Sequence, residues 1–242
     1  MEQIEVNGLT VDIVRKEIKN LHLGVYPPDG RVRVAAPSAV SDEAVRHAVI
    51  TRQGWIRKQQ ERFALQERQS PREMIDGESH YFAGQRYRLK IIENTGPSVV
   101  LLRGKTIMQL HVSPNTTCDQ REQVLLRWYR QQLKSLIPDL LSKWEPVVGV
   151  EVAEWGVKRM KTKWGSCNPD KRRIWLNLEL AKKSAQSLEY IVVHELVHLL
   201  ERTHNDQFRA HMDRFMPQWR VHRDELNRAP LGHHQWEDDY ES

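Results

Sequence analysis

The stretch HELVHLLERTH at residues 194–204 places three histidines and two glutamates inside an otherwise apolar segment. Apolar residues fill most positions from Ile191 to Leu200, which predicts a helix that is buried on nearly every side. Burying imidazole and carboxylate groups costs free energy unless each group finds a partner. One divalent cation would satisfy several of these groups together, so the pattern predicts a metal site.

His194 and His198 are four residues apart, so on a helix their imidazoles project from one face, one turn apart. This spacing suits two ligands of a zinc ion, and Glu195 is placed to reach a metal-held water as a general base. The alternative is a pair of hydrogen-bonded core histidines. With 11 histidines in the chain, roughly 0.04 matches to H-E-x-x-H are expected by chance, which favours the metal site.

A catalytic zinc ion usually has three protein ligands and one open position for water. His204 is the leading candidate for the third ligand because it lies ten residues after His194, the spacing of the extended motif H-E-x-x-H-x-x-G-x-x-H. Glu201 stands where that motif has its glycine. Glu201, Asp206 and Asp213 are alternative ligands, but we expect Glu201 to act instead as an acceptor that orients an imidazole.

The rest of the chain alternates between strand-like and helical patterns. A turn at Pro28, Asp29 and Gly30 predicts a β-hairpin. Ser41 is placed to cap a helix over residues 42–66, and the polar stretch 69–79 resembles a linker. We further expect strands within 80–93, 98–112, 149–161 and 172–180, and helices over 119–140, from Ser184 or Ser187 through the metal motif, and from Asn205 to Met216. The sequence contains no internal repeat.

Composition limits the class of protein. The chain has 242 residues, 39% hydrophobic and 29% charged, which suits a folded protein with its own core. It has no stretch long enough to span a membrane, and its first residues lack the features of a signal peptide. Cys118 and Cys167 are too few for a disulfide framework, so we expect free thiols. These features predict a cytoplasmic protein without membrane contact.

Positive charge is concentrated in residues 158–173. Seven basic residues oppose the single acid Asp170 there, which gives a net charge of +6: Lys158, Arg159, Lys161, Lys163, Lys171, Arg172 and Arg173. The segment directly precedes the strand and helix of the metal motif, so one hypothesis is that it holds an anionic substrate or a nucleic acid near the zinc. The alternative is an ordinary solvated face.

Several residues near the motif are candidates for substrate contact. Asn177, Trp164 and Lys163 are predicted to bind substrate, and Asn177, Tyr190 and Lys163 are candidates to stabilise an oxyanion. Cys167 in the segment WGSC is either an inhibitory fourth ligand or, as we prefer, a small buried thiol beside a glycine turn. Strand 172–180 is either an edge that pairs with an extended peptide or an ordinary half-buried strand.

The segments KTKWGSCN, IWLNLEL, YIVVHELVHLLERTHNDQF and MPQW resemble the YgjP-like metallopeptidase family of bacterial metal-dependent hydrolases. The resemblance covers most of the chain, and the family is more distantly similar to the SprT-like proteases, which combine a zincin core with attraction to DNA. It implies one zinc ion on His194, His198 and His204, with Glu195 as the catalytic acid and base.

Taken together, these patterns predict an α+β fold. We expect a β-rich N-terminal portion with one long helix over residues 1–115, a zincin-like hydrolase domain over 116–230, and an acidic tail over 231–242. The preferred function is a zinc metallopeptidase acting on peptides or proteins. The alternatives are a metal-dependent phosphoanhydride hydrolase acting on nucleotides, and a DNA-associated protease or binding module that uses residues 158–173.

Overall fold

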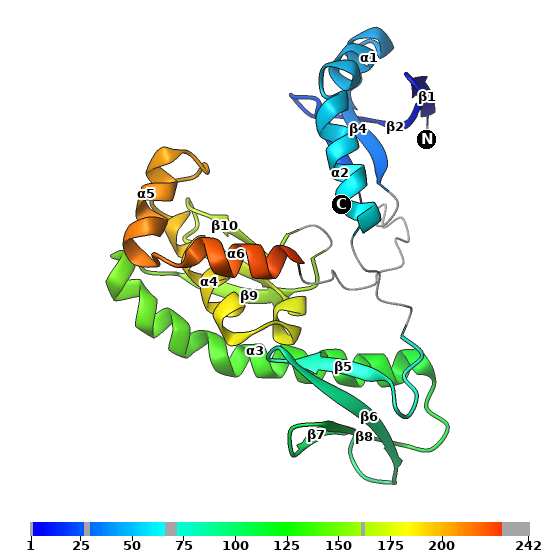
Figure 1. Ribbon diagram of the computed structural model, residues 1–242, viewed down its shortest axis with the longest axis vertical. Coiled ribbons are helices and arrows are strands. Elements are labelled where there is room, and N and C mark those ends of the chain that lie inside the picture. Colours follow the sequence, from blue (N-terminus) through cyan, green and yellow to red (C-terminus); the bar gives the residue numbers. More distant parts are fainter. Residues whose placement is uncertain (1, 27–29, 66–71, 161–162, 229–242) are drawn as a thin grey trace. The chain divides into compact units, whose positions relative to one another are not determined.

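The computed structural model describes residues 2–26, 30–65, 72–160 and 163–228 (Figure 1). The chain divides into two compact units, Met1–Gln69 and Ser70–Ser242. Each unit has its own buried apolar cluster, and the two clusters share no residue. Sheets and helices occur in both units, which confirms the α+β prediction. Among the described residues, no helix combines the length and the apolar character needed to cross a membrane.

The described part of the first unit is a four-stranded sheet followed by two helices. The elements are β1 (Glu2–Val6), β2 (Leu9–Lys16), β3 (His22–Tyr26), β4 (Arg31–Pro37), α1 (Asp42–Thr51) and α2 (Gln53–Leu65). The predicted hairpin is β3 with β4, although residues 28 and 29 of its turn lie outside the described residues. Ser41 caps α1 as predicted, by accepting from the N–H of Ala44. The expected single helix over 42–66 is divided at Arg52.

The second unit begins with another four-stranded sheet and a long helix. The elements are β5 (Ser79–Phe82), β6 (Gln85–Glu93), β7 (Val99–Arg103), β8 (Ile107–Val112) and α3 (Cys118–Val148). Thr117 and Gln120 form a reciprocal capping box that starts α3. The helix continues through Pro138 and ends at Gly149, whose left-handed conformation terminates it.

The two four-stranded sheets share one topology, which the sequence did not reveal. Their strand orders are β1-β2-β4-β3 and β5-β6-β8-β7. In each, the second and fourth strands pair in parallel and the outer pairs are antiparallel. The first hairpin of each turns through two residues with positive φ, Asn7–Gly8 and Ala83–Gly84. A capped helix follows each sheet, so the chain contains a structural repeat.

The compact units divide at residues 69 and 70, whereas the sequence predicted a boundary at 115 and 116. The reason lies in the core, because Leu89 and Met108 of the second sheet are buried in one cluster with Leu133 and Ile137 of α3. That sheet therefore belongs with the helix that follows it. The predicted tail over 231–242 lies outside the described residues.

The metal motif lies in the last part of the second unit. Its elements are β9 (Glu154–Lys158), β10 (Gly165–Asn168), β11 (Arg173–Asn177), the 3₁₀ helix η1 (Leu178–Lys182), α4 (Ala185–Val197), α5 (Asp206–Phe215) and α6 (Trp219–Arg228). In this sheet β11 lies between β10 and β9. The hypothesis that strand 172–180 is an edge is therefore wrong, since both of its sides are paired. The strand also ends at Asn177, whose side chain caps η1.

Candidate metal centre

Helix α4 carries the first two histidines of the motif. It begins at Ser184, whose hydroxyl accepts from the N–H of Ser187, so Ser184 is the cap of the two candidates. Most of the helix is buried, including Val192, Val193 and Leu196. His198 lies just beyond its last residue but keeps helical backbone angles. His194 and His198 therefore project from the same face, as their spacing predicts.

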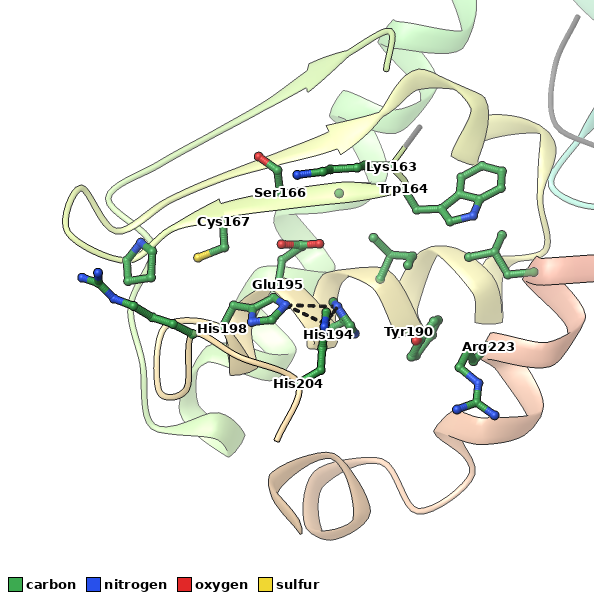
Figure 2. Close-up of a pocket in the computed structure, with 15 residues that line it drawn as sticks. Lys163, Trp164, Ser166, Cys167, Tyr190, His194, Glu195, His198, His204 and Arg223 are labelled. Atoms are coloured by element: carbon green, nitrogen blue, oxygen red, sulfur yellow. Dashed lines mark hydrogen bonds between the residues drawn. The ribbon is translucent and has the colours of Figure 1, made fainter. Parts of the chain in front are cut away.

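The three histidines of the motif converge on one point (Figure 2). The Nε2 atoms of His194 and His198 are 3.2 Å apart, those of His198 and His204 are 3.1 Å apart, and those of His204 and His194 are 3.0 Å apart. Their ring planes are steeply inclined to one another, so only the Nε2 edges meet. This is an arrangement in which three imidazoles can share one cation.

The turn after α4 brings His204 to the other two histidines. The carboxylate of Glu201 accepts hydrogen bonds from the N–H and the hydroxyl of Thr203, each 3.1 Å long, and these bonds lower the pKa of Glu201. Asn205 then caps α5 by accepting from the N–H of Phe208 at 2.9 Å. Glu201 is not among the residues with positive φ. The chain therefore reaches His204 without the glycine of the extended motif.

The main-chain carbonyl of Glu201 fixes the orientation of one imidazole. It lies 3.0 Å from Nδ1 of His198, and because a carbonyl only accepts, Nδ1 carries the proton. Nε2 of His198 then presents its lone pair to the shared point. The acceptor role predicted for Glu201 thus lies in its main chain, while its carboxylate holds the turn.

Phe208 lies against all three imidazoles. Its ring centroid is 5.0 Å from that of His194, 4.7 Å from that of His198 and 4.7 Å from that of His204. The side chain is 2% exposed, so it forms an apolar support that restricts all three rings. Sequence reasoning did not identify this role. The signal available was the position of Phe208 in the first turn of α5, four residues after His204, where the cap residue Asn205 accepts from its N–H.

Burial keeps the imidazoles neutral. It lowers the pKa of His194 to about 3, helped by the neighbouring His198 and His204. The pKa values of His198 and His204 are also lowered, in both cases chiefly by burial. Neutral imidazole is the form that binds a metal ion, so these shifts favour metal binding over protonation.

Glu195 is the most deeply buried carboxylate of the motif, with 3% of the residue exposed. Its Oε2 atom has no hydrogen-bond partner among the described residues. Burial raises the pKa of Glu195 to about 8, and the charge of Lys163 opposes that rise. A β-carbon built on Gly165 would lie 2.8 Å from Cδ of Glu195, closer than real contacts allow. Gly165 of β10 therefore leaves the space that the carboxylate occupies.

The histidines and Glu195 open into a cleft of about 630 Å³ between β10 and the helices α4 and α6 (Figure 2). Lys163, Trp164 and Tyr190 line this cleft. Asn177 is not part of its lining. The Asn177 amide donates to the carbonyls of Met160 and Lys163 at 2.8 and 2.7 Å, so it braces the segment before β10 and has no free group to offer a substrate.

Cys167 lines the same cleft but lies outside the group of converging histidines. Burial raises the pKa of its thiol to about 12, and the charge of Glu195 contributes to the rise. A raised pKa disfavours the thiolate that a metal requires. Both cysteines are free thiols, as predicted; Cys118 is exposed and Cys167 is partly buried.

Acids from outside the basic segment 158–173 pair with its three arginines. Arg159 pairs with Glu122, Arg172 with Glu151 and Arg173 with Glu154, at 3.3, 3.1 and 3.2 Å. The ammonium of Lys158 lies 3.7 Å from the centre of the Trp175 ring, and Lys161 is outside the described residues. Three of the six described basic residues of the segment are thus paired with acids, and no observation among the described residues favours a nucleic-acid site there.

Comparison with known proteins points in the same direction as the geometry. The model of a family described as "YgjP-like, metallopeptidase domain" matches residues 19–229. A solved structure, the metallopeptidase zymogen of Pyrococcus abyssi abylysin, matches at 20% identity over 37% of this chain and 90% of that one. Its TM-score of 0.35 is too low to support an inference. No curated protein matches the chain.

Proposed function

Because the chain belongs to the YgjP-like metallopeptidase family, we propose that it is a zinc-dependent peptidase whose general base is Glu195. Membership in the family implies a metal ion and a peptide or protein substrate. The observation that carries the proposal is the convergence of three Nε2 atoms within 3.2 Å of one another, in the cleft that the buried Glu195 also lines.

The donor set supports zinc as the metal. Three neutral imidazoles with an open fourth position are a common ligand set of catalytic zinc. A tetrahedral ion with bonds of about 2.0–2.1 Å needs ligand nitrogens about 3.3 Å apart, close to the separations of His194, His198 and His204. A bound zinc ion supplies Lewis acidity, which polarises a carbonyl and acidifies water.

The residues of the chain supply the proton transfers. Burial raises the pKa of Glu195 to about 8, which brings the carboxyl near the pH range in which it can both accept and release a proton. Glu195 takes a proton from the attacking water and later delivers it to the leaving amine. Burial also raises the pKa of Tyr190 to about 12, so its hydroxyl stays protonated and is a candidate donor to the carbonyl oxygen. Lys163 is the other candidate.

Strand β10 supports binding of an extended peptide. It is one of the two edge strands of its sheet among the described elements, with β9 at the other edge, and Gly165, Ser166 and Cys167 line the cleft. The side of β10 that faces away from β11 has main-chain groups that can pair with a substrate strand independently of its sequence. The edge role first considered for strand 172–180 is thus assigned to β10 instead.

Two variants test the proposal by metal analysis and by turnover of a peptide mixture. Glu195→Gln should retain one zinc per chain and lose at least about a hundredfold in turnover, the usual range for a general base. His204→Ala should lose zinc. A matched control is His211→Ala, a histidine on α5 outside the converging group. Wild-type protein that holds no transition metal, or that hydrolyses nucleotides but not peptides, would refute the proposal.

A further inference from the structure

The cleft has an unequal distribution of charge. Among the described residues that line it, Lys163, Arg202 and Arg223 are cationic, and Glu195 is the only carboxylate. Glu195 lies buried at the base, with 3% of the residue exposed. The walls that a substrate meets first therefore present three cationic groups, of which Arg202 and Arg223 are paired with acids that lie outside the lining.

The cations lie on both sides of the histidines. Arg223 of α6 lies beyond Tyr190 at one end of the cleft, and Lys163 lies on the β10 side (Figure 2). Arg202 follows the C-terminal end of α4, in the turn that leads to His204, and it also lines the cleft. Tyr190 and His198 are eight residues apart, about 12 Å along a helix. An extended peptide covers that length with about three to four residues.

Arg202 and Arg223 can exchange their present partners for a ligand at a small cost in free energy. Arg202 pairs with Asp170, and the two side chains are 64% and 75% exposed. Arg223 pairs with its neighbour Asp224 at 2.9 Å, with 42% and 51% exposed. Exposed pairs of this kind contribute little to the stability of a protein. A substrate carboxylate can therefore replace Asp170 or Asp224 with little loss. Lys163 has no ion-pair partner among the described residues.

From this arrangement we infer that the cleft selects peptides with acidic side chains on both sides of the scissile bond, within about two residues of it. The inference rests on the proposed peptidase function and names the substrate class of the same site. Trp164, Ile191 and Leu226 also line the cleft, so apolar side chains between the acidic ones are compatible with it.

The test uses three synthetic peptides that differ only at two positions flanking the scissile bond, which carry Glu, Gln or Lys. With zinc-loaded full-length protein, kcat/KM should fall in the order Glu, Gln, Lys, with a Glu-to-Gln ratio of roughly three to ten, as expected for two exposed charge pairs. The ratio should approach one as salt is raised to about 1 M. Arg202→Gln and Arg223→Gln should each lower the ratio by roughly twofold.

Arg127→Gln is the matched control, because Arg127 is exposed on α3 and the change in net charge is the same. It should leave the Glu-to-Gln ratio unchanged. Arg223→Glu should shift the preference toward the Lys peptide, which a merely structural effect would not do. Equal cleavage of the Glu and Gln peptides would overturn this inference but not the proposed function. The same holds if Arg127→Gln lowers the Glu-to-Gln ratio as much as Arg202→Gln or Arg223→Gln does. Failure to cleave any peptide would overturn the proposed function itself.

Discussion

At the scale of single residues, the site depends on groups that touch the histidines and Glu195 without being chemically reactive. Phe208 supports three imidazole rings, and the carbonyl of Glu201 orients one of them. Gly165 leaves space for the carboxylate of Glu195. The reactive residues could be identified from their chemistry, but these contacts depend on packing between elements that are distant in sequence.

Gly165→Ala tests the role of that space. A methyl group there would displace the Glu195 carboxylate, so turnover of the peptide mixture should fall at least about tenfold, since misplacement of a catalytic group by about 1 Å is costly. Zinc content should not change, because the three atoms nearest the added methyl group all belong to Glu195. Ser166→Ala, the neighbouring change on β10, serves as the control. Full activity of Gly165→Ala would show that the carboxylate has room to move.

At the scale of elements, the hairpin β5–β6 supports the start of α4, the helix that carries His194 and Glu195. The N–H groups of Ala83 and Gly84 donate to the carbonyls of Ala181 and Lys182 in η1, at 2.9 and 3.3 Å. A β-carbon on Gly84 would lie 3.2 Å from Cα of Ser184, the cap of α4. In the repeated sheet of the first unit, the equivalent position Gly8 has nothing within 4 Å of an added β-carbon.

The repeat offers an internal control for this contact. Gly8 and Gly84 have nearly the same φ, 77° and 78°, so alanine at either should cost about 1–2 kcal/mol from left-handed strain. Gly84→Ala should cost more, because it also crowds Ser184, and it should weaken zinc binding. Chemical denaturation and zinc titration of both variants measure the difference. Equal destabilisation by the two would mean that the hairpin does not brace α4.

At the scale of the whole molecule, every candidate catalytic residue lies in the second unit. The family pattern nevertheless begins at residue 19, inside the first unit. The two units have separate apolar clusters, so neither depends on the other for its core. A shorter chain can therefore test whether the second unit binds zinc and turns over peptides without the first.

A chain of residues 70–242 should fold and bind one zinc ion, because His194, His198 and His204 and the core that supports them are all within it. Circular dichroism and metal analysis check this expectation. Turnover of the short peptides should stay within about threefold of the full chain, since no residue that lines the cleft lies in the removed part. Loss of zinc from the shorter chain would instead assign the first unit a role in building the site.

The metal chemistry that we propose, and most of the helices and strands, could be predicted from the sequence. The spacing of His194, Glu195 and His198 predicts a metal-binding face because helical periodicity is local, and the caps at Ser41 and Asn205 act within one turn. It did not predict helix α6, although Trp219 and Leu226 follow helical spacing.

The contacts between segments that are distant in the chain could be seen only in the folded structure. It paired the arginines of residues 158–173 with acids elsewhere, joined the sheet β5–β8 to α3, and made β10 the edge strand beside the cleft. It also revealed a repeat whose strand order no residue pattern displayed. Pairing between strands and between charges joins residues far apart in the chain, and local patterns carry no record of such partners.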